Sequence, residues 1–420
     1  MRVLHTAGRD KLRAQKLIAQ LEQRRNTVDE RVVPVVTRII NGVRKGGDAA
    51  LRRYAARLDQ FSKQAPLQIS AEEMERAWDE VSPAFRSSVQ AAAKNIRRFA
   101  QKQLPKEWSF EQVSGLVVGQ KIRPLSSVGC YVPSGRYPLP STLLMTVIPA
   151  LVAGVERIAA VSPRPAKETL AAASFLGIKE FYQVGGAQAV AALAYGTESI
   201  PRVDKIVGPG NAYVTAAKKL VSFDCAIDML AGPTEIVVNS DTGEPAFIAA
   251  DLAAQAEHDP DALAIFVTTN KELAARVSDE VKRCVRENPI AAQAIKKNGI
   301  IFVTASVAEA HDLTNRLASE HLTVDTESDL DWVKNAGSVF IGNYSAQPLG
   351  DYISGPNHTL PTGGLARVRG GLSVNDFLKI MTVQKYTSKG LQAMGPKAIA
   401  LAEAEGLKGH AEAIRTRGAR

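Results

Sequence analysis

The sequence predicts an α/β protein with two parallel sheets that carry helices on their faces. Short runs of β-branched and apolar residues alternate with Ala-rich helical stretches from residue 128 to residue 233. A second alternation of the same kind begins at residue 234. Several strands end in glycine turns that open directly into helices. Such alternation is typical of parallel sheets, and 420 residues suffice for two or more domains.

The first α/β unit is expected to contain four strands, each followed by a helix. In chain order the segments are VGCYVPSG, PLPSTLLMTVIPALVAG, ERIAAVSP, KETLAAASFLG, EFYQVGG, AQAVAALAYG, DKIVGPG and NAYVTAAKKLV. In open sheets of this kind, ligands bind at the carboxyl ends of the strands. The glycine turns at those ends are therefore candidate ligand-binding segments.

The second unit repeats the alternation with longer helices. Its segments are TEIVVNSD, EPAFIAADLAAQAEH, ALAIFVTTN, KELAARVSDEVKRCVREN, GIIFVTA, VAEAHDLTNRLASEH, LTVDT and SVFIGN. Residues 1–120 have a mostly helical pattern, and the first 17 residues are interpreted as a charged amphipathic helix. From about residue 375 the pattern again predicts helices, in DFLKIMTVQKYTSKGLQAM and GPKAIALAEAEGLKGHAEAIRTR.

Composition narrows the class of protein. No run of 18 apolar residues is present, so no transmembrane helix is expected, and the N-terminus lacks the apolar core of a secretory signal. Three cysteines with no zinc-ribbon spacing favour a reducing cytoplasm. The net charge of +9 is spread along the chain. This charge is interpreted as an ordinary basic surface rather than a DNA-binding face, and attraction of an anionic cofactor is a compatible alternative. No nucleic-acid or membrane partner is expected.

The segment AAQAEHDPDA offers a possible metal site at the end of a predicted helix. Gln255 and His258 stand three residues apart, which places both on one helix face. Asp351 supplies a carboxylate at a glycine-flanked turn, and His358 and His410 also stand in marked positions. A lone histidine is more often a hydrogen-bonded structural residue, and glutamine is an uncommon zinc ligand. The spacing alone therefore favours a structural role.

Two further patterns leave the chemistry open. ASEHLTVDT places Glu320 beside His321 between a helix and a strand, where they could serve two proton transfers or form a buried polar pair. No G-x-G-x-x-G motif occurs. GPGNAYVTAAKK and VGGAQAVAALA offer glycine turns at helix N-termini, where backbone N–H groups favour an anion. Ordinary turn chemistry explains these glycines equally well.

Taken together, these stretches resemble the histidinol dehydrogenase family over essentially the whole chain. The resemblance is carried by YVPSGRYPLPSTLLMTVIPALVAGV, VGGAQAVAALAYGT, VDKIVGPGNAYVTAAKK, DMLAGPTEIVV, AAQAEHDPDA, ASEHLTV, GDYISGPNHTLPTGG and EGLKGHAEA, in matching order. It implies two incomplete Rossmann-like domains related to the aldehyde dehydrogenase-like fold, with small helical extensions at both ends.

The resemblance also implies a division into domains. Residues 1–26 would form a helical extension, and residues 129–233 an NAD-binding α/β domain. Residues 27–128 and 234–373 would together form a discontinuous catalytic domain. Residues 374–420 would form a helical tail that reaches the partner subunit of a homodimer.

The family oxidises L-histidinol through the aldehyde to L-histidine with two NAD⁺, as the last step of histidine biosynthesis. The resemblance implies one Zn²⁺ per subunit, bound by Gln255, His258, Asp351 and, from the partner subunit, His410. In the family, zinc positions the imidazole and amine of the substrate, so its role is mainly orientation.

The same resemblance assigns proton transfer to Glu320 and His321. His321 would take the hydroxyl proton, and Glu320 would activate the water that attacks the aldehyde.

The remaining expected contacts surround the substrate and the cofactor. Thr234, where many members have Ser, and His358 would contact the substrate. Glu405 of the partner would pair with its amine. The matched NAD contacts are Tyr131, Gln188 and Asn211.

Three alternatives remain beside this interpretation. A relative of the family could oxidise another small hydroxy compound, although the presence of Glu405 with the complete zinc set favours histidinol. A zinc hydrolase or metal-dependent binding protein would not need a nucleotide-binding unit. Nucleic-acid binding rests on net charge alone and would require a continuous basic face.

Overall fold

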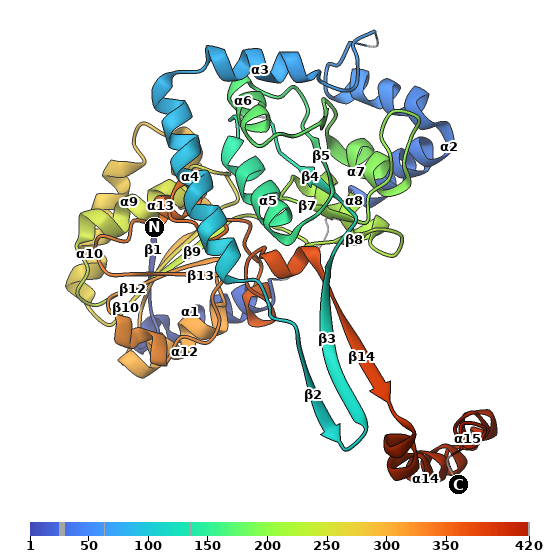
Figure 1. Cartoon of the computed structure of the whole chain (residues 1–420). Coiled ribbons are helices and arrows are strands. Elements are labelled where there is room, and N and C mark those ends of the chain that lie inside the picture. Colours follow the sequence, from blue (N-terminus) through green and yellow to red (C-terminus); the bar gives the residue numbers. More distant parts are fainter. Residues whose placement is uncertain (25–29, 63, 135–136, 419–420) are drawn as a thin grey trace.

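The computed structural model describes residues 1–24, 30–62, 64–134 and 137–418. It contains two α/β units and a projecting arm (Figure 1). The expected α/β class with two parallel sheets is confirmed. The expected domain boundary at residues 26 and 27 lies outside the described residues. No helix among the described residues is long and apolar enough to cross a membrane.

The larger unit is built on a six-stranded parallel sheet. Its strand order is β1-β11-β10-β9-β12-β13. The strands are β1 (Arg2–His5), β9 (Glu235–Asn239), β10 (Leu263–Thr268), β11 (Gly299–Val303), β12 (His321–Val324) and β13 (Ser338–Ile341). Consecutive side chains of a strand point to opposite faces. In β9, Ile236 and Val238 accordingly pack in one core while Val237 packs in the other.

Helices cover both faces of this sheet, which explains why its strands are nearly continuous apolar runs. On one face lie α9 (Pro245–Ala256), α10 (Lys271–Cys284) and α11 (Pro289–Asn298). On the other face lie α1 (Lys11–Glu22) and α12 (Val307–Leu317). The short helix α13 (Gln347–Tyr352) follows β13 and contacts α9.

The second unit is a five-stranded parallel sheet with strand order β6-β5-β4-β7-β8. The strands are β4 (Ser127–Tyr131), β5 (Arg157–Val161), β6 (Glu180–Tyr182), β7 (Lys205–Val207) and β8 (Ala226–Ile227). One face is covered by α5 (Pro140–Ala153) and α6 (Lys167–Phe175). The other is covered by α7 (Gly186–Tyr195) and α8 (Ala212–Val221).

Three N-terminal helices add an outer layer to this second unit. They are α2 (Val33–Leu58), α3 (Ala71–Glu80) and α4 (Pro83–Lys102). Helix α2 packs on α7 and α8, α3 packs on α6, and α4 packs on α5. The expected grouping of residues 27–128 with the larger unit is therefore wrong for these helices. Their apolar faces match the helices of the five-stranded sheet, a pairing between distant segments that periodicity does not reveal.

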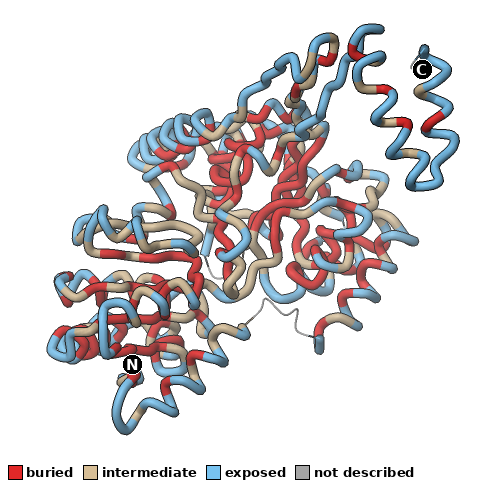
Figure 2. Tube along the Cα trace, turned by 90° about the horizontal axis from the view of Figure 1, so that it is seen from below, coloured by how far each residue is buried: buried red, intermediate tan, exposed pale blue. Residues whose placement is uncertain are grey.

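The arm is a three-stranded antiparallel sheet that ends in two helices away from the body (Figure 1). It consists of β2 (Trp108–Val113), β3 (Leu116–Pro124) and β14 (Leu378–Tyr386), in the order β14-β3-β2. It continues into α14 (Ser388–Ala404) and α15 (Lys408–Arg415). Most of the arm is exposed in the single chain (Figure 2).

Two predicted helical segments are strands. Residues 378–386 form β14, which is paired along its length with β3, and residues 2–5 form β1, which is paired with β11. Both pairings join segments about 260 or more residues apart. Strand β14 is exposed beyond its first residue, so it shows no inside–outside alternation from which a strand could be predicted. The described residues also include four 3₁₀ helices: Gly8–Asp10, Glu327–Asp331, Leu365–Arg367 and Val374–Phe377.

Candidate active site

A cleft of about 1810 Å³ lies where the two α/β units meet. Single small-molecule sites usually occupy roughly 300–1,000 Å³, so this cleft has room for more than one ligand. Ten of the twelve residues that the sequence analysis singled out line it. They are Tyr131, Gln188, Asn211, Thr234, Gln255, His258, Glu320, His321, Asp351 and His358.

The five-stranded unit contributes residues from the carboxyl ends of its strands, as expected. Tyr131 is the last residue of β4. Gln188 lies in the first turn of α7, which follows β6, and Asn211 is the N-cap of α8, which follows β7.

The six-stranded unit contributes residues from the opposite ends of its strands. Thr234 directly precedes β9, Glu320 directly precedes β12, and His321 is the first residue of β12. Strands β9 and β12 are neighbours, with His321 opposite Ile236. In this sheet the candidate residues therefore lie at the amino ends of the strands, unlike those of the five-stranded sheet. The cleft is set by how the two sheets face each other, which no single strand encodes.

Glu320 is a buried carboxyl group held by two donors. The Thr234 hydroxyl donates to its Oε2 over 2.5 Å, and the Glu235 backbone N–H donates to the same oxygen over 2.9 Å. Burial raises the pKa of Glu320 to about 8, although both hydrogen bonds act in the opposite direction. A carboxyl with a pKa near neutrality is suited to acid–base work.

His321 is equally buried, and burial lowers its pKa to about 3. Its Nδ1 lies 3.7 Å from Glu320 Oε2, which is too far for a hydrogen bond, and its Nε2 lies 3.8 Å from Asp351 Oδ1. The adjacent pair makes no direct hydrogen bond, yet both residues line one cleft. At neutral pH, His321 is a neutral imidazole and Glu320 is mostly protonated.

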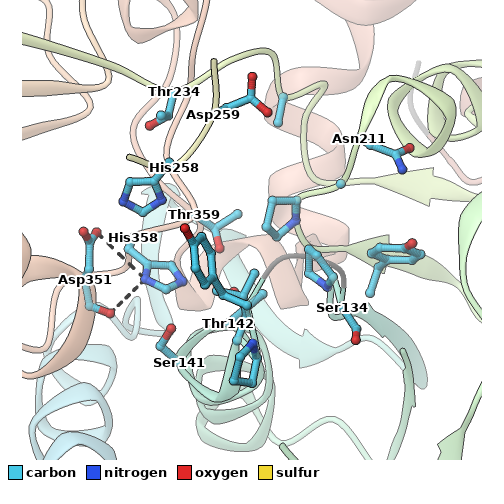
Figure 3. A pocket seen from close by; sticks show the side chains of 18 of the residues that line it. Ser134, Ser141, Thr142, Asn211, Thr234, His258, Asp259, Asp351, His358 and Thr359 are labelled. Carbon is cyan, nitrogen blue, oxygen red and sulfur yellow. Dashed lines mark hydrogen bonds and ion pairs between the residues drawn. The ribbon is translucent and has the colours of Figure 1, made fainter. Parts of the chain in front are cut away.

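Asp351 lies near the three histidines His258, His321 and His358. Burial raises its pKa, while His258 and the amide of Gln347 act to lower it. Gln347 Nε2 donates to Asp351 Oδ2 over 3.1 Å. His358 Nδ1 lies 2.9 Å from the Asp351 backbone oxygen and 4.0 Å from Oδ1 (Figure 3). Burial lowers the pKa of His358 to about 4.

The side-chain oxygen of Gln255 is buried and has no hydrogen-bond partner. Gln255 is fully buried in α9, and its Nε2 donates to the Thr234 hydroxyl. Its Oε1 is buried without any hydrogen bond. A buried carbonyl oxygen normally has a partner, so a ligand or cation that accepts its lone pair would complete it. His258 lies just beyond the end of α9 rather than inside it, exposed and facing Asp351 and His358 (Figure 3).

These donors fit a divalent zinc ion only in part within one chain. Gln255 Oε1, the His258 imidazole and the Asp351 carboxylate are an oxygen, nitrogen and oxygen set that zinc accepts. In the part of the chain that is described, no three His, Cys, Asp or Glu side chains are grouped closely enough to hold a metal. Glu405 and His410 are exposed on the distant arm and do not reach this cleft.

In both glycine turns that could favour an anion, side chains already accept hydrogen bonds from N–H groups at the start of the helix. The Tyr131 hydroxyl accepts from Gly186 N–H over 2.9 Å. The Asn211 side chain caps α8 by accepting from the N–H groups of Tyr213 and Val214. Side chains therefore occupy these N–H groups, in agreement with the alternative that the glycines serve ordinary turns. Gly208, with φ +111°, lies against the Tyr131 backbone oxygen, where a Cβ would approach to 2.2 Å.

Two buried contacts of site residues were missed at the sequence level: Asp59, which binds Gln188, and Gln347, which binds Asp351. Asp59 lies 129 residues from Gln188 in the sequence. The only signal in the sequence is that Asp59 is an acidic residue at the end of a helix. Gln347 stands four residues before Asp351, which is helical spacing.

The comparisons with known proteins agree over nearly the whole chain. The histidinol dehydrogenase family matches residues 22–418. A histidinol dehydrogenase of Methanothermobacter thermautotrophicus is 46% identical over 94% of this chain and 96% of that protein.

Solved structures are also similar. The histidinol dehydrogenase of Elizabethkingia anophelis has a TM-score of 0.93 at 36% identity, covering 99% of this chain and 98% of that one. An acetylating aldehyde dehydrogenase of Geobacillus thermoglucosidasius has a TM-score of 0.48 at 14% identity, covering 90% of this chain and 98% of that one. By the family match and the identity to its relatives, this chain belongs to the histidinol dehydrogenase family.

Proposed function

We propose that this protein oxidises L-histidinol to L-histidine through histidinaldehyde, with two NAD⁺ and one zinc ion per subunit. The observation that carries the proposal is the juxtaposition of Glu320 and His321 in the cleft, with pKa values moved in opposite directions. Two such groups suit two different proton transfers. NAD⁺ would supply the hydride acceptor, and Zn²⁺ would orient the imidazole and amine of the substrate.

In the first oxidation, neutral His321 accepts the proton of the substrate hydroxyl. Its lowered pKa keeps the imidazole unprotonated at working pH. The imidazolium that forms lies 3.7 Å from Glu320 Oε2, and a nearby positive charge favours the ionised carboxylate. The imidazolium therefore lowers the pKa of Glu320, and once Glu320 has released its own proton to the solvent it is the base that the second oxidation requires.

In the second oxidation, Glu320 removes a proton from the water that attacks the aldehyde, and the hydrate that forms would then lose a hydride to a second NAD⁺. Thr234 and the Glu235 N–H hold the carboxylate in place through both steps. Because both proton-transfer groups are buried, bulk water does not replace them. Holding the aldehyde in the cleft between the steps prevents loss of a reactive intermediate.

The zinc ligands would be Gln255 Oε1, His258 and Asp351, with His410 of the partner subunit. The unpartnered Gln255 oxygen and the buried Asp351 carboxylate support this set. The exposed arm, which carries His410 and Glu405 away from the body, supports donation to a second copy (Figure 1). Each site of the homodimer would then be completed by the other chain.

The decisive experiment measures the amount of NADH that forms per L-histidinol consumed, with and without a chelator. Two NADH per substrate are expected, with activity lost on chelation and restored by zinc. One NADH, or turnover of a different hydroxy compound only, would move the protein to another substrate within the same fold.

The shared site can be tested by mixing two inactive variants. His258→Ala and His410→Ala homodimers should each be inactive, because every site lacks one ligand. In a purified heterodimer, one of the two sites carries both changes and the other carries neither, so about half of the wild-type activity should return. Absence of recovery in verified heterodimers would show that His410 serves its own chain.

A further inference from the structure

Asp59 links two segments of the second unit beside the cleft. It is the C-cap of α2, which packs along α7 (Figure 1). Its Oδ2 accepts from the Gln188 amide Nε2 over 2.8 Å and from the Gly185 N–H over 3.2 Å. Both Asp59 and Gln188 line the cleft.

The contact with Asp59 determines which end of the Gln188 amide is free. Gln188 is fully buried, and its Nε2 is taken by the carboxylate. Its Oε1 is buried without a hydrogen bond. A flipped amide would set Oε1 against a carboxylate oxygen, and two acceptors repel each other. The free polar atom at this place is therefore an acceptor, and a buried acceptor without a donor is unfavourable.

No group among the described residues donates a hydrogen bond to this oxygen. The Gly186 N–H is bound to the Tyr131 hydroxyl and the Gly185 N–H is bound to Asp59. A donor group of a ligand in the cleft would satisfy this oxygen. On a nicotinamide dinucleotide the candidate donors are the ribose hydroxyls, the carboxamide NH₂ and the adenine amino group.

We propose that Asp59 is a positioning residue: it orients the Gln188 amide so that its oxygen accepts a hydrogen bond from a donor group of the dinucleotide. This inference rests on the proposed NAD⁺-dependent function. It assigns a role to a residue outside the expected NAD contacts, and it states the polarity of the group that the cofactor must offer.

The test measures NAD⁺ binding without substrate, by titration calorimetry on the zinc-loaded protein. Asp59→Asn keeps one acceptor oxygen instead of two and can turn its NH₂ group toward Gln188, so the Gln188 amide is no longer held in one orientation. The NAD⁺ dissociation constant should rise about tenfold, as for loss of one buried hydrogen bond. Saturating NAD⁺ should restore kcat, so that the effect appears in KM.

A matched control is Asp48→Asn, also on α2. Asp48 accepts from the Ser199 N–H and hydroxyl and does not line the cleft. The control removes a comparable carboxylate from the same helix and should leave the NAD⁺ dissociation constant unchanged. A tenfold rise in both variants would make Asp59 a structural residue only and overturn the proposal.

Exchanging the amide and the carboxylate between residues 59 and 188 distinguishes an effect on amide orientation from a general loss of structure. Gln188→Glu places two carboxyl groups together and should weaken NAD⁺ binding strongly. Adding Asp59→Asn restores an amide–carboxylate pair with the donor on residue 59 and a free acceptor oxygen on residue 188. The double variant should bind NAD⁺ more tightly than Gln188→Glu alone, and binding no better than that single variant would contradict the proposal.

Cofactor analogues identify the donor. Acetylpyridine adenine dinucleotide lacks the carboxamide NH₂, and nicotinamide hypoxanthine dinucleotide lacks the adenine amino group. The analogue that lacks the donor should bind wild type more weakly and show no further loss in Asp59→Asn. If Asp59→Asn binds both analogues tenfold more weakly than wild type does, the donor is a ribose hydroxyl.

Two outcomes separate this inference from the proposed function. If wild type binds no NAD⁺, the proposed function fails. If wild type binds NAD⁺ and Asp59→Asn binds it equally well, only the inference fails. Should Asp59→Asn not fold by circular dichroism, the near-isosteric Gln188→Met, which lacks the acceptor, replaces it. Unchanged NAD⁺ affinity in that variant would overturn the inference.

Discussion

Glu320→Gln is expected to stop the reaction after the first oxidation, so that one NADH forms per histidinol instead of two. The amide has the shape of the carboxylate, and its oxygen can still accept from Thr234 and the Glu235 N–H, so the fold should be kept. An amide does not take a proton from water. Oxidation of histidinaldehyde should therefore slow about 10²- to 10⁴-fold, the usual effect of losing a general base.

The measurement is single-turnover NADH formation with histidinol and, separately, with histidinaldehyde. Glu309→Gln is a matched control in the same unit, because Glu309 also accepts from one threonine hydroxyl, that of Thr6, and one backbone N–H. It lies outside the cleft and should leave both oxidations near wild type. Undiminished aldehyde oxidation in Glu320→Gln would remove Glu320 from the role of base.

The rate of aldehyde oxidation should increase with pH. Burial raises the pKa of Glu320 to about 8, so below pH 8 the group is mainly the protonated, inactive acid. Aldehyde oxidation by wild type should rise with pH through about 8 and level off above it. This ascending limb should be absent in Glu320→Gln. A limb that persists in the variant would belong to another group.

Lys218→Met is expected to produce the largest loss of stability, about 3–5 kcal/mol in the free energy of unfolding. Lys218 and Asp228 form an ion pair whose side chains are at most 3% exposed. Lys218 Nζ also donates to the Gly208 backbone oxygen over 2.9 Å. The Asp228 carboxylate accepts from the Gly208 and Met229 N–H groups. Removal of the lysine leaves a buried carboxylate without its cation.

Urea unfolding, followed by circular dichroism, measures this loss. The control is Lys282→Met, whose ion pair with Asp279 is at least 67% exposed on each side, and it should change stability by less than about 1 kcal/mol. Adding Asp228→Asn to Lys218→Met should recover part of the loss, because the buried charge is gone and an acceptor remains for the Gly208 N–H. An unfolding midpoint of Lys218→Met equal to that of wild type would contradict the expected penalty.

Much of the fold could be predicted because, in the two α/β units, the local residue pattern agrees with the helix or strand that forms. Each strand of the sheets, β1 and β8 excepted, is an apolar run followed by a helical pattern. The arm could not be predicted in the same way. Strand β14 is exposed and finds its partner, β3, only through pairing of segments more than 250 residues apart. Local periodicity carries no information about such pairing.

The sequence by itself determined the α/β alternation and the family motifs, because both are written in contiguous residues. Only the tertiary structure decided how these residues meet. It brought the amino ends of β9 and β12 to the carboxyl end of β4, and so placed Glu320 and His321 across a cleft from Tyr131. It also decided which amide oxygens, on Gln188 and Gln255, are left free. The physical reason is that burial and hydrogen-bond pairing depend on neighbours from distant segments, which no local pattern specifies.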